Sequence, residues 1–500
     1  MPSIVPRRTL PPNPSLEQLR KKAKDFRDLV RTGHPKGLEI VRILHPDPPP
    51  ASDFRLADAQ LVIAREYGFA SWRRLREHLV LLARYTRSPQ RPGANAGDAT
   101  DEFLRLACLT YRPSWKALAG EEPDGPHRHR AARELLARHP HLARENIYTA
   151  AAAADPSAMR AFLAADATNA NLEGGPHGWP PLLYLTLSRL DTGDPLATAR
   201  LLLEHGADAN AGYLPDGEPP PVTALSAVLR GSQDPANQPA HPRSMSLARL
   251  LLEHGADPND ERAVDNACNY PHEDDALKLL LRFGAGRESG SGGPWRARLG
   301  RRIATPAELV RYQLRHAAEW DLPDRIRLLV NLADQPSIDS ALSAATVCGN
   351  TGVERLLLAA GASRGEASPA ERIIAACMRA DGPDVAEVER LRAAEPDLDF
   401  SGPWPDPMLQ AAALNRPEAI KMLVALGFPL DDRRGTPLHV AALTGHLELA
   451  KMLVEMGADP HAEADDDTPG QFTPPGDRSP LSWARYLDRH DVAAYLESLS

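Results

Sequence analysis

The chain has 500 residues, of which 42% are hydrophobic and 25% charged, and its net charge at pH 7 is -9. This composition is typical of a soluble globular protein, and the lack of an 18-residue apolar run excludes an ordinary membrane-spanning helix. No apolar segment of a secretion signal follows the first residues. The four cysteines contain no CxxC motif, so we expect no disulfide framework, no metal and no cofactor.

Residues 1–90 differ from the rest in charge, with 17 basic against 9 acidic residues, a net of +8. Apolar residues recur at three-four spacing from Leu16 to Val30, which predicts an amphipathic helix. Two further helices are predicted on either side of Gly68, with Ser71 as the N-cap of the second. We therefore expect a small helical N-terminal domain over residues 1–90, followed by a linker over residues 91–100.

The basic residues of this region could form a nucleic-acid-binding face. They are Arg20, Lys21, Lys22, Lys24, Arg27, Arg73, Arg74 and Arg76. The alternative is a solvated helix surface, or one that faces the acidic remainder of the chain. Asp25, Asp28 and Glu77 interrupt the patch, which favours this alternative.

Beyond residue 100 a leucine-rich phrase that ends in glycine recurs along the chain. Residues 201–208 read LLLEHGAD, and residues 250–257 repeat the same eight letters. Looser copies end at Gly284, Gly361 and Gly427, and another follows 30 residues later at Gly457. Each leucine run is apolar surface that one helix cannot bury alone, and glycine suits the end of a helix. The pattern predicts stacked helical repeats.

Residues 435–448, GTPLHVAALTGHLE, contain the clearest motif. Thr436 is placed to cap a helix and Pro437 fits its first turn. We expect His439 to hydrogen-bond loop backbone, and Tyr184 takes the same position in residues 178–184, GWPPLLY. The stretch resembles the opening of an ankyrin repeat, which implies about 33 residues and two helices per repeat.

Other segments are similar to a group of bacterial ankyrin-repeat proteins with a helical N-terminal domain. These segments are residues 56–72, 147–152, 178–184 and 293–300. The resemblance implies a cytoplasmic, non-enzymatic solenoid and brings no known ligand. The TPLH motif is absent from the middle repeats, so their boundaries between residues 286 and 407 stay open.

We therefore expect an all-α ankyrin-repeat solenoid of about ten helix pairs over residues 101–500, with short β-turn or hairpin loops. The first and last repeats are expected to be atypical, because one face of each must meet water. Loop insertions are predicted at residues 211–222, 231–245, 286–303 and 464–478.

Insertions are the places where a solenoid would contact a partner. Residues 294–302, PWRARLGRR, place tryptophan beside arginine, a combination that binding hot spots favour. The alternative is that Trp295 fills a groove between repeats. The expected partner-binding residues are Tyr213, Leu214, Tyr270, Trp295, Arg296, Arg298 and Trp404.

No motif of a nucleotide site, hydrolase or metalloprotease is present, so we expect no enzyme. The leading interpretation is a monomeric, cytoplasmic scaffold or adaptor for an unknown protein partner. The alternative is a nucleic-acid-associated adaptor that binds through the basic N-terminal helices.

Overall fold

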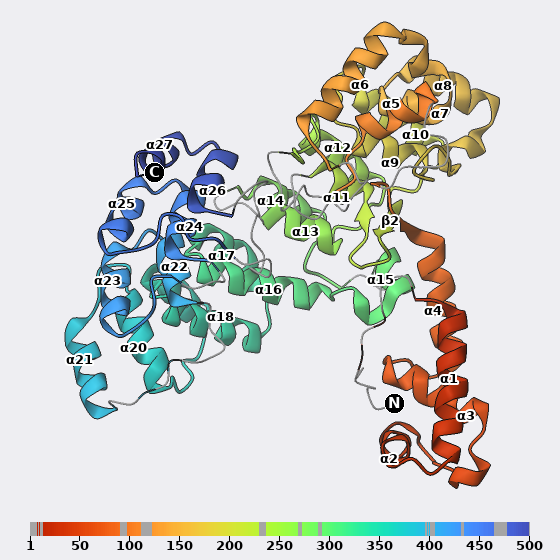
Figure 1. The fold of residues 1–500 in the computed structure, drawn as a ribbon. Coiled ribbons are helices and arrows are strands. Elements are labelled where there is room, and N and C mark those ends of the chain that lie inside the picture. Colours follow the sequence, from red (N-terminus) through yellow and green to blue (C-terminus); the bar gives the residue numbers. More distant parts are fainter. Residues whose placement is uncertain are drawn as a thin grey trace.

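The computed structural model describes most of the chain. The described residues are 8, 10, 14–90, 98–111, 123–229, 237–268, 273–288, 293–395, 398, 400, 406–431, 435–464 and 478–499. Stacked helix pairs form an arch, and four N-terminal helices extend from one limb of the arch as a separate arm (Figure 1). None of the helices in this described part is both long and apolar enough to cross a membrane.

Four helices form the N-terminal arm: α1 (Leu16–Arg31), α2 (Pro35–Leu44), α3 (Leu56–Glu66) and α4 (Trp72–Tyr85), with a 3-10 turn at Ala51–Asp53. They enclose a small core of their own that includes the fully buried Phe54 and Leu75. The predicted helix from residue 16 and the pair of helices around Gly68 are confirmed, and the Ser71 side chain accepts a hydrogen bond from the Arg74 amide.

Helix α2 was not predicted; Gly37 lies inside it, and glycine weakens helices. A Cβ at residue 37 would lie 3.4 Å from Val30 Cγ2 and 3.6 Å from Leu29, which is ordinary van der Waals contact, so the packing does not require glycine there. The helix buries Val41 and Leu44 in the core of the arm. Tertiary contact thus overrides local preference at this position.

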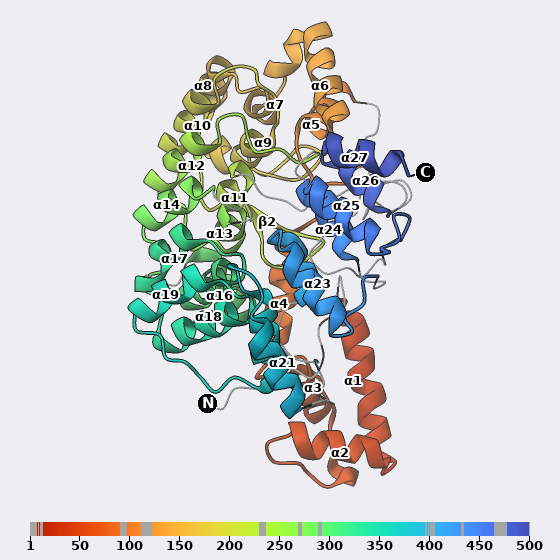
Figure 2. The same ribbon diagram turned by 90° about the vertical axis from the view of Figure 1, so that its left-hand side faces the viewer.

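The first helices of the successive pairs stack in one row. They are α5 (Ala99–Ala107), α7 (Ile147–Ala152), α9 (Pro181–Leu187), α11 (Ala224–Val228), α13 (Glu261–Cys268), α16 (Pro306–Glu319), α18 (Gln335–Val347), α20 (Pro369–Met378), α22 (Pro407–Ala413), α24 (Pro437–Thr444) and α26 (Pro480–Tyr486). Helix α5 begins inside the segment expected to be a linker, because Asp98 caps it. The row lines the inner side of the arch (Figures 1 and 2).

The second helices lie along the outer side of the arch (Figures 1 and 2). They are α6 (Pro126–Arg138), α8 (Pro156–Ala165), α10 (Pro195–Glu204), α12 (Ser244–Glu253), α14 (Asp275–Arg282), α17 (Pro323–Leu329), α19 (Thr351–Ala359), α21 (Val385–Ala394), α23 (Pro417–Ala425), α25 (Leu447–Glu455) and α27 (His490–Glu497). Short 3-10 turns occur at Pro140–Arg144, Ala167–Asn171 and Val330–Leu332.

Asparagine side chains join successive repeats in the amino-terminal half of the array. Asn171 Nδ2 donates to the Gly206 carbonyl at 2.7 Å, and Asn210 Nδ2 donates to the Gly255 carbonyl at 2.8 Å. The oxygen of each amide also accepts a backbone N–H from the next repeat at 2.8 Å. Asn259 makes the same pair of contacts to the following turn. Backbone groups at the ends of the leucine-rich helices are thereby satisfied by the neighbouring repeat.

Arginine side chains also join successive repeats, and they do so at the C-terminal ends of the first helices. Arg325 Nη1 donates to the Cys268 carbonyl at 2.7 Å, and Arg489 Nε donates to the Leu443 carbonyl at 3.0 Å. Arg189 donates in the same way to the Ala227 carbonyl at 2.7 Å. Each of these carbonyls lies at or near the C-terminal end of a first helix, where a cation is electrostatically favourable.

The motif of residues 435–448 forms the predicted structure. Thr436 Oγ1 accepts from the His439 amide, Pro437 begins helix α24, and Gly445 ends it in the left-handed conformation at φ 82°. His439 Nε2 lies 2.8 Å from the Arg478 carbonyl, which confirms its predicted contact with loop backbone.

The insertion at residues 211–222 forms a hairpin of strands β2 (Gly212–Pro215) and β3 (Val222–Thr223). Strand β1 (Thr86–Arg87), directly after α4, joins this hairpin in parallel with β2 and completes a sheet of order β1-β2-β3. The insertion at 286–303 forms helix α15 (Pro294–Leu299) and a 3-10 turn at Gly300–Arg302. The insertions at 231–245 and 464–478 lie partly outside the described residues.

Candidate interaction site between the N-terminal arm and the repeats

Trp295 lies at the junction between the N-terminal arm and the repeats. Gly293 and Pro294 start helix α15, and the tryptophan on its first turn is 6% exposed. Its indole Nε1 donates to the Asn210 carbonyl at 3.0 Å. The other side of the ring meets Tyr85 at the end of α4, with 4.9 Å between ring centroids and an interplanar angle of 68°. One side chain therefore contacts both the repeat hairpin and the arm.

An apolar cluster forms around this tryptophan. Its buried members are Leu82 from α4, Leu214 from β2, and Trp295, Leu299 and Ile303 from the insertion. This cluster, which we call the junction cluster, is separate from the core of the arm and from the two cores of the repeats. Because the burial of apolar area stabilises contacts roughly in proportion to that area, the junction cluster is the main apolar attachment of the arm.

Two arginines of the same insertion contact aromatic rings of the arm. The Arg298 guanidinium lies 5.3 Å from the centroid of Tyr85 and 5.0 Å from that of Trp295. The Arg302 guanidinium lies 5.9 Å from the centroid of Phe69. These are cation–π distances, at which the ring face attracts the positive charge. Burial, followed by the Arg302 charge, lowers the pKa of the neighbouring His78 to about 4, so this imidazole is neutral at pH 7.

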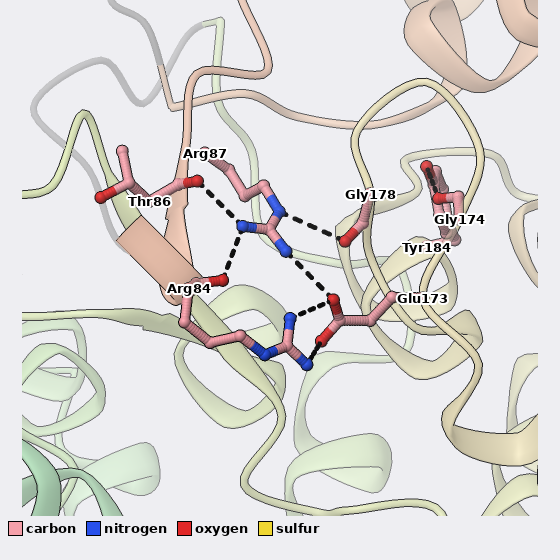
Figure 3. A network of polar contacts seen from close by, with 7 residues as sticks. All are labelled: Arg84, Thr86, Arg87, Glu173, Gly174, Gly178 and Tyr184. Atoms are coloured by element: carbon pink, nitrogen blue, oxygen red, sulfur yellow. Dashed lines mark hydrogen bonds and ion pairs between the residues drawn. The ribbon is translucent and has the colours of Figure 1, made fainter. Parts of the chain in front are cut away.

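Residues 86–90 continue the attachment as strand β1 followed by a turn at residues 89–90, and we call this segment the strap. Arg84 at the end of α4 binds both carboxylate oxygens of Glu173, at 2.5 and 2.6 Å (Figure 3). Arg87 Nη2 binds the same carboxylate at 3.1 Å, and Arg87 Nε donates to the Gly178 carbonyl at 3.3 Å. The bond to Glu173 raises the pKa of Arg84. A single acidic side chain of the repeats thus holds two arginines of the arm.

A second carboxylate binds the far end of the strap. Asp216, in the turn of the β2–β3 hairpin, accepts from Ser88 Oγ at 2.5 Å and from Gln90 Nε2 at 3.0 and 3.1 Å. Its own amide donates to the Arg87 carbonyl at 3.0 Å. Asp216 has φ 51°, a left-handed conformation that aspartate tolerates in turns. The hairpin turn therefore places a carboxylate over the strap.

A buried aromatic stack lies next to the hairpin and the loop at residues 174–179. Trp179 stacks on Tyr213 at 5.0 Å, and Tyr184 Oη donates to the Gly174 carbonyl at 2.9 Å while accepting from the His177 amide at 3.0 Å. Tyr184 thus performs the loop-binding role of His439, as its position predicts. Burial, followed by nearby arginines, lowers the pKa of His177 to about 3.

Most of the expected partner-binding residues contact other residues of the same chain in this structure. Tyr213, Leu214 and Trp295 are buried, so in this conformation they contact other parts of the protein and offer no surface to a partner. Arg298 binds rings of the junction, and Arg296 lies 3.5 Å from Glu288. For Trp295 this corrects the expectation of an exposed hot spot and favours the alternative of a groove-filling side chain. Tyr270 and Trp404 lie outside the described residues.

Sequence reasoning missed the other half of this junction. Arg84, Tyr85 and the strap carry no motif, and neither Glu173 nor Asp216 belongs to one. The one signal in the sequence is the opposite charge of residues 1–90 and of the remainder, which leaves open which residues meet.

Four of the eight basic residues of the predicted face form ion pairs within the arm. Lys22 Nζ lies 2.8 Å from Glu66, and Arg27 Nη2 lies 2.7 Å from Asp28. Arg73 and Arg74 both approach Glu77, at 3.7 and 3.5 Å. This pairing lowers the positive potential available to a polyanion and supports the reading of a solvated helix surface.

Acidic side chains gather near the junction at residues 257–265. Burial raises the pKa of Asp260 to about 6, and this side chain accepts from Thr223 Oγ1 at 2.6 Å. Burial also raises the pKa of Asp265 to about 6. Within the described residues no three metal-ligating side chains come together to hold an ion. The acidic residues instead cap helices and bind neighbouring turns.

One exposed aromatic residue was not predicted. Tyr312 on α16 is 62% exposed although α16 belongs to the inner row of helices. Two exposed arginines lie on the same helix. Arg311 directly precedes the tyrosine, and Arg315 lies one turn beyond Arg311. Tyrosine and arginine are the side chains that hot spots of binding favour. The signal in the sequence is a tyrosine among charged residues in a helix otherwise rich in buried apolar residues.

Comparison with known families supports the repeat fold. A family model described as ankyrin repeats (3 copies) matches residues 373–464, which include helices α21 to α25. No curated protein sequence matches the chain. Ankyrin repeats generally serve as protein–protein interaction modules and are typically non-catalytic.

Proposed function

We propose that this chain is a non-enzymatic adaptor whose ankyrin solenoid, about ten helix pairs over residues 101–500, binds a protein partner. The family match over residues 373–464 carries this proposal, and the continuous row of stacked first helices supports its extension to both sides. Repeat arrays of this kind present extended concave surfaces that suit binding. Residues 1–90 would form a separate N-terminal domain, and the resemblance to bacterial ankyrin-repeat proteins favours the cytoplasm as its location.

The exposed side of α16 is the best-placed binding surface within the described residues. Tyr312 presents an aromatic ring on a rigid helix, and the same helix exposes Arg311 and Arg315, of which Arg315 pairs with Glu319 at 2.8 Å. An aromatic ring loses little conformational entropy on binding, and arginine adds directional hydrogen bonds. Tyr270 and Trp404, which lie outside the described residues, remain candidates for additional contacts.

Affinity capture from the source lysate, with and without nuclease, tests this function. We expect a near-stoichiometric protein that survives nuclease and is lost with Tyr312→Ala. Val385→Ala is the matched control, because Val385 is an exposed apolar residue of the second helix α21 on the outer row. Capture of only nuclease-sensitive material, or no captured protein at all, would contradict the proposal.

A further inference from the structure

The strap occupies a surface with three features of a peptide-binding site. Strand β2 offers a hydrogen-bonding edge to β1, Leu214 and Trp295 offer apolar side chains on which Leu82 and Tyr85 of α4 pack, and Glu173 and Asp216 place carboxylates at the two ends. A strand edge, an anchoring pocket and charged ends are the elements by which extended peptides are recognised. The strand edge, the two carboxylates and four of the five cluster residues belong to the repeats, whereas Leu82 and Arg84 of α4 and the strap supply the complementary groups.

We propose that this surface is a docking site for a basic, extended segment of a partner protein, and that the chain covers it with its own strap in the unbound state. The inference rests on the proposed function as an interaction protein and names the chemistry of one partner segment. Such a segment would place arginines beside Glu173 and an apolar side chain against Leu214 and Trp295.

The charges select a basic occupant. Glu173 binds Arg84 and Arg87 together, and Asp216 binds the donors of Ser88 and Gln90. An acidic segment would bring carboxylates against both of these acids, at a cost in repulsion. The docking site therefore discriminates by charge as well as by strand pairing.

The polar contacts of the strap are weak, and exposure of Leu214 and Trp295 also requires Leu82 and Tyr85 of α4 to leave the junction cluster. The strand of the strap pairs over two residues, Thr86 and Arg87, and the ion pairs at Glu173 are partly exposed to solvent. Exposed ion pairs contribute about 0.2–1 kcal/mol each and weaken with salt. The arm keeps its own core, which includes Phe54 and Leu75, so it can leave the repeats without unfolding.

A peptide of this chain's own residues 80–91, labelled with a fluorophore, is a direct probe of the site. Its binding to the full-length protein is measured by fluorescence anisotropy, and hydrogen exchange at residues 212–215 reports whether the strap is closed. The variant R84E/R87E opens the strap by charge repulsion from Glu173 and leaves the surface of the repeats intact. The control R73E/R74E makes the same change of charge on α4, where both arginines approach only Glu77 among the ion pairs of the arm.

We expect R84E/R87E to bind the peptide about tenfold or more tightly than the wild type or R73E/R74E do, and to exchange faster at residues 212–215. Adding Glu173→Gln to R84E/R87E should weaken peptide binding, because the arginines of the peptide lose their carboxylate partner and no charge-swapped ion pair can close the strap again. Equal binding to all the variants, an opened strap without peptide binding, or a strap that stays closed in R84E/R87E would each overturn the proposal. The peptide result is independent of capture from lysate, so failure of one is distinguishable from failure of the other.

Discussion

The two ends of the repeat array use the same helix pairs in different ways. The carboxyl-terminal repeats, which include the family match at residues 373–464, have short connections between the two helices of a pair, as at 414–416 and 445–446. The amino-terminal repeats carry the hairpin β2–β3 and helix α15, and these insertions hold the N-terminal arm. Insertions that looked like sites for a foreign partner thus serve first as sites for the chain itself. Aromatic and basic residues in an insertion, such as those of residues 294–302, therefore identify a binding surface. They do not identify whether a partner protein or another part of the chain binds there.

The polar chemistry of the two ends differs as well. Buried histidines with a lowered pKa concentrate in the amino-terminal repeats, where burial brings the pKa of His129, His177 and His241 to about 3. In the carboxyl-terminal repeats His439 has a lowered pKa for the same reason, and it keeps a carbonyl partner at 2.8 Å. The two regions should therefore respond differently to mutation and to acid.

The largest effect is expected from Trp295→Ala. Removing this buried side chain should cost about 3–5 kcal/mol of local stability, because the cavity would open between the arm and the hairpin. Denaturant unfolding monitored by segment-resolved hydrogen exchange would show the loss around residues 72–90 and 212–223. Trp483→Ala, which removes a buried tryptophan of the last repeat, is the control and should leave residues 72–90 unchanged. Equal protection of the arm in both variants would refute the role of Trp295.

Acid should open the amino-terminal repeats before the carboxyl-terminal ones. A histidine whose folded pKa lies below its unfolded value of 6.5 destabilises the fold as pH falls from 6.5 toward the folded pKa. For His177 alone the loss between pH 7 and pH 5 is about 2 kcal/mol. Asp260 and Asp265, with pKa values raised to about 6, oppose this effect at lower pH, and burial raises the pKa values of Asp101, Asp124 and Asp257 in the same direction. The three histidines begin to destabilise the fold first, as pH falls through 6.5.

The variant His177→Gln isolates this contribution, since glutamine stays neutral at both pH values. Urea unfolding at pH 7 and pH 5 should show a smaller pH dependence in the variant than in the wild type. Hydrogen exchange at pH 5 that rises first in residues 407–455 would contradict the predicted order of opening.

A smaller effect is expected from the asparagines that join the repeats. Asn210→Ala removes two hydrogen bonds to the next repeat, to the Gly255 carbonyl and the Asp257 amide, and should cost about 1–3 kcal/mol. In the carboxyl-terminal repeats Asp431 accepts the Asp459 amide at 3.3 Å, a longer contact, so Asp431→Ala should cost less. Thermal unfolding of the two variants compares them directly, and a larger loss for Asp431→Ala would show that the asparagine contacts are dispensable.

The smallest effect is expected from Glu173→Gln. The carboxylate is partly exposed, so its ion pairs with Arg84 and Arg87 should contribute about 1 kcal/mol or less. We expect a small loss of protection in residues 84–90 that shrinks further at high salt, because salt already weakens the wild-type contact. A loss that does not depend on salt would indicate that Glu173 acts by shape and not by charge.

Sequence reasoning predicted the parts of this fold that follow from local pattern. The leucine runs, the Thr436 cap, the loop contact of His439 and the equivalent role of Tyr184 all depend on residues within one or two repeats. The junction depends on contacts between residues far apart in the chain, such as Tyr85 with Trp295 and Arg84 with Glu173. Strand β1 is two residues long and has no periodicity to detect. For that reason the sequence indicated that the insertion at 286–303 is a binding surface, but it did not indicate that the N-terminal arm covers this surface.

The most direct test of the account is hydrogen exchange over residues 72–90 of the full-length protein, compared between the wild type and Trp295→Ala. If the insertion at 286–303 holds the N-terminal arm, exchange at the end of α4 and in the strap should accelerate in the variant, while residues 407–455 keep their protection. Unchanged exchange at residues 82–90 in a variant that is otherwise folded would show that the arm is held by something other than the junction cluster.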